Sequence, residues 1–165
     1  AAAARIEALF ARSGGENSYS LHAELQEVTH NLVGIIRTGA ELKDAIAKIA
    51  DIRKRSANVA VSGGRKFNPG FHLAFDLDNM LLVAESTAKS AIGREESRGG
   101  HTRDDFPGMD MGWRQHNHIS SFDGTQVTVR KQALPFMPKE LFSLFDVEEL
   151  KKYMTPDEVA KGGSN

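Results

Sequence analysis

Apolar residues recur every three or four positions through the first half of the chain, which is the spacing of amphipathic helices. The first such stretch begins after Ser18 and Ser20, two residues of a type that commonly caps a helix N-terminus. Gly39 follows the stretch and marks its predicted end, as glycine often does at a helix C-terminus. The apolar positions of this predicted helix are Leu21, Leu25, Val28, Leu32 and Ile35.

The same spacing predicts two further helices. The second has apolar positions at Leu42, Ala45, Ile46, Ile49 and Ile52. Glycine-containing turns then lead to a third, from Phe71 to Gly93. Its stripe has large residues towards the start and alanines towards the end, so we expect close packing near Ala84 to Ala91. The stripe is Phe71, Ala74, Leu77, Leu81, Ala84, Ala88 and Ala91.

The helical periodicity stops after Gly93. Residues 94–112 carry charges, four glycines and one proline without a repeat, and they predict a loop. From Trp113 the pattern is typical of a β-hairpin, because apolar and polar residues alternate. The hairpin is predicted to have a two-residue turn at Asp123-Gly124 and strands at His118 to Phe122 and Thr125 to Arg130.

The last part of the chain is weakly helical. Thr155-Pro156-Asp157-Glu158 combines an N-cap, a proline at the first helical position and an acid at the third, and predicts a short helix ending by Gly162. The fold class is therefore mainly α: an antiparallel three-helix bundle followed by a loop, a small β-hairpin and a short helical tail. The predicted division is a lead-in (1–17), the bundle with its loop (18–112), the hairpin (113–134) and the tail (135–165).

Composition excludes several classes of function. The 165 residues include 21 lysines and arginines against 22 aspartates and glutamates, a balance that gives no indication of a nucleic-acid partner. The absence of cysteine excludes iron–sulfur clusters, thiolate zinc sites and disulfides within these residues. No apolar run approaches the roughly 20 residues that a membrane-spanning helix requires, so direct membrane insertion is not expected. The chain does not begin with methionine, and we expect it to be a piece of a longer protein.

Two groups of residues have the spacing of metal ligands. Glu27 and His30 form one Glu-x-x-His pair on a helix, but a di-iron bundle requires two such pairs and two further glutamates. His116 and His118 share one side of a predicted strand, and His101 would complete a set of three zinc ligands. Two histidines at this spacing are common by chance, and we assign no metal site.

Candidate catalytic groups are equally sparse. Asp78 and Glu85 share a face of the third helix, where paired carboxylates can serve as acid and base. Arginines just downstream offer a better explanation, in which these acids form ion pairs. The chain has no Gly-x-Ser-x-Gly, no Gly-x-Gly-x-x-Gly after a strand and no phosphate loop.

The segment from Arg94 to Pro107 is the densest in charge. It holds three arginines, four acids and one histidine around the paired glycines Gly99 and Gly100. Mixed charge beside Phe106 and Trp113 is typical of an interface with satisfied ion pairs.

This segment resembles a signature of the closing domain of succinate dehydrogenase and fumarate reductase flavoprotein subunits. The matching residues are Glu96, Ser97, Arg98, Gly99, His101, Arg103, Asp105, Phe106 and Pro107, followed by Asp110, Trp113 and His116. Further matches upstream are Glu24-Leu25-Gln26, Val33-Gly34, Arg37-Thr38-Gly39, Asn79-Met80-Leu81 and Ala84-Glu85. Three departures are Gly100 in place of the family's usual alanine, the less charged stretch from Gly108 to Met111, and His22 where arginine is frequent.

The resemblance implies a complete subunit that binds FAD, interconverts succinate and fumarate, and passes electrons to an iron–sulfur subunit and a membrane quinone site. It implies a cytoplasmic location, peripheral at the inner face of the cell membrane through partner subunits. The family's flavin and substrate residues lie in earlier domains, so we assign no catalytic, cofactor-binding or metal-binding residue to this chain. The expected partners are the FAD-binding and capping domains of the same subunit and the iron–sulfur subunit.

We therefore expect a non-catalytic scaffold that braces the flavin domain. The residues expected to organise the interdomain interface are Ser97, Arg98, His101, Arg103 and Asp105. Two alternatives remain open: the corresponding domain of aspartate oxidase or adenylylsulfate reductase, and an independent helical binding module.

Overall fold

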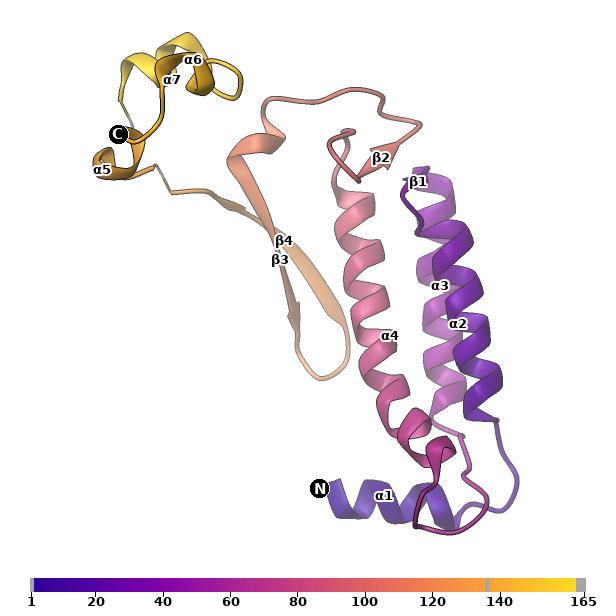
Figure 1. Ribbon diagram of the computed structural model, residues 1–165. Helices are drawn as coiled ribbons and strands as arrows, with labels where there is room; N and C mark the ends of the chain where they lie inside the picture. The colour runs from indigo at the N-terminus through magenta and orange to yellow at the C-terminus, as the bar shows by residue number, and fades with distance from the viewer. Residues whose placement is uncertain (1, 136, 163–165) are drawn as a thin grey trace.

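The computed structural model describes residues 2–135 and 137–162, and its main feature is a bundle of three antiparallel helices (Figure 1). The bundle helices are α2 (Ser18–Leu32), α3 (Gly39–Ser56) and α4 (Pro69–Gly93). A further helix, α1 (Ala2–Ala11), lies across the end of the bundle where α2 begins (Figure 1). The predicted fold class, mainly α with a small hairpin, is confirmed.

The core is built from the predicted apolar stripes. Leu21, Leu42, Ile49 and Leu81 are completely buried between the three helices. The alanines towards the end of α4 are buried as well, as the sequence predicts: Ala84, Ala88 and Ala91. Because the stripes face one another, the helices bury these apolar positions against each other and so form the core.

The N-terminal cap of α2 differs from the prediction. Asn17, and neither serine, is the N-cap, and its side chain accepts hydrogen bonds from the N–H groups of Tyr19 and Ser20. Ser18 lies inside the helix and is buried, with its hydroxyl donating to the Gly70 carbonyl at 3.3 Å. Asparagine and serine are almost equivalent as caps, so the sequence alone could not choose between adjacent candidates.

The connection between α2 and α3 also differs. The first helix ends at Leu32 and not at Gly39, which is the first residue of α3. Thr38 caps α3 by accepting from the Glu41 N–H, while the Glu41 carboxylate accepts from the Thr38 N–H. Ile35 is consequently outside the helical stripe and 67% exposed. The threonine and glutamate form a capping box, which marks the start of α3. This signal outweighs that of Gly39, which the sequence pattern indicates as the end of the preceding helix.

Residues in this connection pair with the loop after α4. The short strand β1 (Ile36–Arg37) is parallel to β2 (Thr102–Arg103), with Arg37 opposite Arg103. The Thr102 N–H donates to the Ile35 carbonyl and the Asp104 N–H to the Arg37 carbonyl, both at 3.1 Å. The predicted loop therefore contains a strand that joins two connections at the same end of the bundle.

The hairpin forms, but its turn is longer than predicted. After a short 3-10 helix (Trp113–Gln115), β3 (His116–Phe122) pairs antiparallel with β4 (Val127–Ala133). Four residues lie between the strands, because Phe122 pairs with Val127. The Asp123 carboxylate accepts from the N–H groups of Thr125 and Gln126, and Gly124 has φ of 98°. The two-residue prediction was wrong because this side-chain bonding favours a wider turn.

The tail consists of short helices: α5 (Lys139–Phe142), α6 (Val147–Leu150) and α7 (Pro156–Ala160). The predicted capping box is present, with Thr155 accepting from the Glu158 N–H and the Glu158 carboxylate accepting from Thr155. The Arg114 guanidinium binds both the Tyr153 carbonyl and the Glu158 carboxylate, and this links the tail to the hairpin. Among the described residues, no helix combines the length and apolar character needed to cross a membrane.

Candidate interdomain site

The charged loop after α4 is organised around one buried carboxylate. The Glu96 side chain is fully buried, and its oxygens accept hydrogen bonds from Arg94 (2.5 and 2.8 Å) and from Arg98 (3.0 to 3.2 Å). The Asp110 N–H also donates to it at 3.0 Å. Burial opposes ionisation, but these donors outweigh it and lower the pKa of Glu96 to about 2. At neutral pH Glu96 is thus an anion that ties the two ends of the loop together.

A second ion pair fastens the loop to two helices. Arg103 is 2% exposed and binds the Asp105 carboxylate through Nε and Nη2, each at 2.8 Å. Its Nη1 donates to the carbonyls of Ala91 and Ile92 at 3.1 and 3.0 Å, which satisfies the C-terminal end of α4. The Asp105 carboxylate also accepts from the Gly39 N–H at 2.9 Å, at the N-terminus of α3.

This arrangement leaves no room for a side chain at Gly39. A Cβ there would lie 2.9 Å from Arg103 Nη2 and 3.0 Å from an Asp105 oxygen. The hydrogen bonds from Arg103 and from the Gly39 N–H lower the pKa of Asp105 well below its usual range, with Arg103 the larger cause. The glycine is therefore required by the ion pair beside it.

His101 is half-buried between Arg37 and the backbone of Arg94. Its Nδ1 lies 2.6 Å from Arg37 Nη2 and its Nε2 lies 2.9 Å from the Arg94 carbonyl. Because a guanidinium can only donate, Nδ1 is the acceptor and Nε2 carries the proton. Burial lowers the pKa of His101, and the nearby arginine charges lower it further, while the carbonyl acts in the opposite direction.

Ser97 and the paired glycines shape the loop itself. The Ser97 hydroxyl accepts from the Arg103 N–H at 2.9 Å and lies 2.9 Å from the Phe106 carbonyl. Arg98 and His101 exchange backbone hydrogen bonds of 2.8 and 3.1 Å across the tight turn at Gly99-Gly100. Gly99 has φ of 58°, which glycine adopts at little cost.

The candidate metal ligands lie in different surroundings. The His118 ring contacts Trp113 edge-on, with ring centres 5.3 Å apart, and His116 Nδ1 lies 3.1 Å from the Gly112 carbonyl. Glu27 and His30 are exposed on α2. Within residues 2–135 and 137–162, no group of three or more histidines and acids is placed to hold a metal ion.

The paired carboxylates on α4 are explained by ion pairs, but with partners that the sequence did not indicate. Glu85 binds Arg53 of α3 and lies 2.6 Å from Lys89 Nζ. Asp78 lies 2.6 Å from Arg5 Nη2 of α1. The arginines downstream of α4 are instead used within the loop, so the expectation that they would pair with these acids was wrong.

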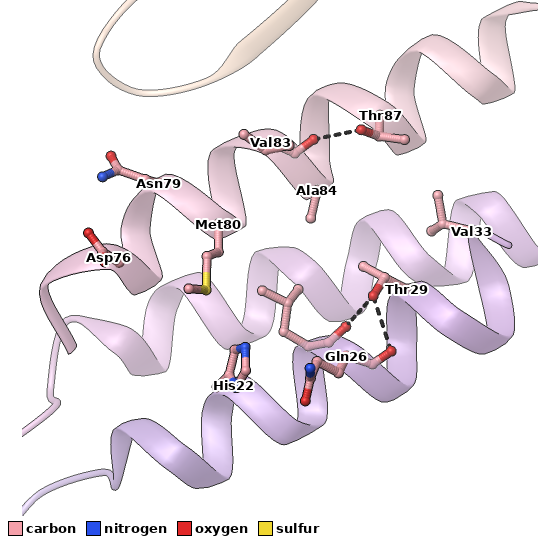
Figure 2. Close-up of a pocket in the computed structure, with 11 residues that line it drawn as sticks. His22, Gln26, Thr29, Val33, Asp76, Asn79, Met80, Val83, Ala84 and Thr87 are labelled. Atoms are coloured by element: carbon pink, nitrogen blue, oxygen red, sulfur yellow. Dashed lines mark hydrogen bonds between the residues drawn. The ribbon is translucent and has the colours of Figure 1, made fainter. Parts of the chain in front are cut away.

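An apolar groove runs between α2 and α4 on the bundle surface (Figure 2). It has a volume of about 650 Å³. Met80 projects from α4 towards α2, opposite His22 and Gln26, while Val83 is 64% exposed at its edge (Figure 2). The residues that line it belong to α2, to Val33 directly after α2, and to α4.

A second group of exposed apolar side chains lies around the charged loop and the β1 connection. Its members are Ile35, Ile36, Phe106, Met109 and Met111, between 37% and 67% exposed. The Phe106 ring lies under the Arg103 guanidinium, 4.9 Å from ring centre to Cζ. The ion pairs thus hold this apolar group in a fixed position.

The structure brings the five sequence-predicted interface residues together in one loop, each bonded within the domain. Sequence reasoning did not assign Arg37, Gly39, Arg94 or Glu96 to the site. Glu96 lies two residues from an arginine on each side, which could have indicated a shared ion pair. No nearby sequence pattern indicates that Arg37 and Gly39 belong to the site, because both lie more than 60 residues from their partners in the loop.

Comparisons with known proteins identify the family of this chain. The family described as "Fumarate reductase flavoprotein C-term" matches residues 22–151. An uncharacterized FAD-dependent oxidoreductase of Methanocaldococcus jannaschii is 38% identical over 66% of this chain and 20% of its own length. The fumarate reductase flavoprotein subunit of Haemophilus influenzae is 37% identical over 65% of this chain and 18% of its own.

Solved structures contain the same fold. Mycobacterium smegmatis Sdh1, in complex with UQ1, superposes with a TM-score of 0.87 and 45% identity over 96% of this chain and 28% of that one. Escherichia coli quinol fumarate reductase FrdA gives a TM-score of 0.72 and 26% identity over 79% of this chain. The chain spans about one fifth of the length of the curated relatives cited above.

Proposed function

Because the chain belongs to the family of fumarate reductase flavoprotein C-terminal domains, we propose that it is the closing, non-catalytic domain of a flavoprotein subunit that uses FAD to interconvert succinate and fumarate. The flavin, the substrate and the hydride chemistry belong to the larger part of such a subunit. The role of this chain is to brace that part.

One observation carries the proposal of a scaffold. The residues whose side chains are best suited to catalysis or ligand binding use their polar atoms for hydrogen bonds within the domain. His101 uses both ring nitrogens for bonds within the domain, and Arg103 is buried against Asp105 and the end of α4. Glu96 is held as an anion by two arginines. A group that must exchange protons or bind substrate requires a free, accessible position, which these residues do not have.

The interface residues then act by shaping a contact surface. Ser97, Arg98, His101, Arg103 and Asp105 fix the backbone of the loop, and the exposed apolar side chains around it, such as Met109, make the contact. The groove between α2 and α4 adds a second apolar area on the same bundle. Apolar side chains left exposed next to a rigid polar frame are typical of an interface core.

The expected partners follow from this assignment. The FAD-binding and capping domains of the same subunit would cover the apolar surface, and an iron–sulfur subunit would receive the electrons. The subunit would lie in the cytoplasm, at the inner face of the cell membrane, attached through those partners. The succinate dehydrogenase and fumarate reductase names of the relatives favour this assignment over aspartate oxidase, adenylylsulfate reductase or an independent binding module.

The experiment compares three samples: the complete subunit, the subunit without this domain, and the 165-residue chain alone. Fumarate reduction is measured with a reduced dye as electron donor. We expect activity in the first, little in the second because the flavin part is no longer braced, and none in the third. Fumarate reduction by the 165-residue chain alone would overturn the proposal.

Variants locate the contact surface. Val83→Asp in the α2–α4 groove and Met109→Asp in the loop are expected to weaken docking of the domain onto the flavin part. Leu144→Asp is the matched control, since Leu144 is 76% exposed in the tail. Equal binding by all three variants in a pull-down with the flavin part would contradict the assignment of the surface.

A further inference from the structure

A polar groove lies between the end of α4, strand β3 and the charged loop. Its volume is about 460 Å³. The side chains that matter for its chemistry are Arg37, Arg94, Ser86, Ser90, Ser120 and His118. Among the described residues no acidic side chain lines this groove, here called the basic groove.

The arginines around the basic groove differ in whether they have a carboxylate partner. Arg94 and Arg98 share the single carboxylate of Glu96, and Arg103 is paired with Asp105. Arg37 donates to the carbonyls of Val33 and Gly34 and to a neutral histidine, so none of its described partners is a carboxylate. Glu95 and Asp110 also act electrostatically on Arg103 and Arg98, so Arg37 is the guanidinium of this group whose described hydrogen-bond partners include no carboxylate.

The donors of the basic groove are also incompletely used. Arg94 bonds to Glu96 through Nε and Nη2, and its Nη1 has no partner among residues 2–135 and 137–162. Arg37 Nε is buried there without a hydrogen-bond partner. The hydroxyls of Ser90 and Ser120 face each other at 3.4 Å, from α4 on one side and β3 on the other. Hydroxyl and guanidinium donors in a groove lined by no acidic side chain among the described residues favour an anion with two oxygens.

We propose that the basic groove binds a carboxylate, held by Arg94 and the serine hydroxyls within the field of Arg37. The carboxylate comes either from a small free acid or from an aspartate or glutamate in another part of the longer subunit. Both sources present the same planar pair of oxygens to the groove. This site adjoins the α2–α4 groove, with Thr87 lining both, but its polar chemistry does not depend on the proposed function.

The first experiment uses the complete 165-residue chain with acetate and succinate as probes. Binding is followed by the NMR signal of the His118 ring, which borders the groove. We expect a saturable shift with either acid and none with acetamide, the neutral analogue of acetate. A chain that shows no saturable shift with either acid would overturn the proposal.

Substitutions then test the location. Ser120→Asp places a negative charge in the basic groove and is expected to weaken binding roughly tenfold. Ser121→Asp adds the same charge one residue away, on the opposite face of β3, and is the matched control. Ser86→Asp, on α4, repeats the test from the other wall. Equal affinity in Ser120→Asp, Ser86→Asp and Ser121→Asp would contradict binding in this groove.

A structure of the complete subunit distinguishes the two sources. An aspartate or glutamate from outside this chain, seated in the basic groove, identifies the subunit itself as the source. An open groove, in a subunit that still binds acetate there, identifies a free acid. A groove filled by neutral atoms of the subunit would contradict both.

Discussion

The bundle and the loop after it bury different kinds of side chain. In α2, α3 and α4 the fully buried residues are aliphatic, such as Leu21 and Leu81, whereas the deepest residues of the loop are Glu96 and Arg103. Aliphatic burial gains free energy from every contact and depends little on direction. A buried ion pair offsets a large desolvation cost only if each oxygen and each N–H finds a partner.

The two regions therefore respond differently to change. Removing methylene groups from the bundle core lowers the free energy of unfolding in proportion to the number removed. Removing one partner of an ion pair in the loop leaves an uncompensated charge. The bundle supplies stability and the loop supplies a specific shape. The following predictions test this difference, from the largest expected effect to the smallest.

Leu81→Ala is expected to have the largest effect. The side chain is completely buried in the bundle, so its truncation leaves a cavity and should lower the free energy of unfolding by about 3–4 kcal/mol. Urea denaturation followed by circular dichroism measures the change. Val83→Ala on the same helix is the control, expected within about 0.5 kcal/mol because Val83 is exposed.

Glu96→Gln is expected to cost about 2–3 kcal/mol, because two guanidiniums lose their shared carboxylate. The loss of stability should be local to the loop. The backbone amides of Arg98 and Asp110 should exchange hydrogen faster in the variant than in the original chain, and those of the bundle should change less. Glu95→Gln, a charge change at the exposed neighbouring residue, should leave both measurements unchanged. An equally stable Glu96→Gln variant would show that the loop does not depend on this ion.

The same carboxylate predicts a loss of stability in acid. The pKa of Glu96 is lowered to about 2 in the folded protein from an ordinary value of 4.5. The folded state therefore binds fewer protons between these values, and the stabilisation is complete above pH 4.5 and lost as pH falls towards 2. Glu96→Gln should show a shallower decline over this range than the original chain.

Gly39→Ala is expected to destabilise by about 1–2 kcal/mol although alanine is the better helix former. The added methyl group meets Arg103 and Asp105, as the structure shows. Gly100→Ala is the matched control: a Cβ there meets nothing within 4 Å, and its stability should be unchanged. A stabilised Gly39→Ala would mean that the ion pair moves aside at little cost.

His101 is expected to give the smallest effect, which begins at a higher pH than that of Glu96. Burial lowers its pKa in the folded state below 6.5, so protonation favours the unfolded chain. Stability should be complete above pH 6.5 and decline as pH falls from 6.5 through the folded pKa of the ring. Thermal unfolding at several pH values, compared with His101→Gln, isolates this contribution, and identical profiles would contradict it.

Much of the bundle could be predicted because its information is local. The three stripes, including Leu21, Ile49 and Leu81, follow from spacing alone, and the Thr155 capping box follows from four adjacent residues. The prediction of helix ends was wrong where two local signals competed. Gly39 is typical of a helix end, but it directly follows Thr38, which caps the start of the next helix. The hairpin turn was misjudged because the bonding of Asp123 was not visible in the sequence pattern.

The sequence by itself determined the helical fold class and, through the loop signature, the family, because both depend on residues close together along the chain. Only the tertiary structure decided that Glu96 and Arg103 are buried, that Arg53 of α3 is the partner of Glu85, and that Arg37 borders a groove whose described lining includes no acidic side chain. A charged residue reads as exposed in sequence, since burial is favourable only when a partner is present. Those partners come from distant segments, and folding is what brings them together.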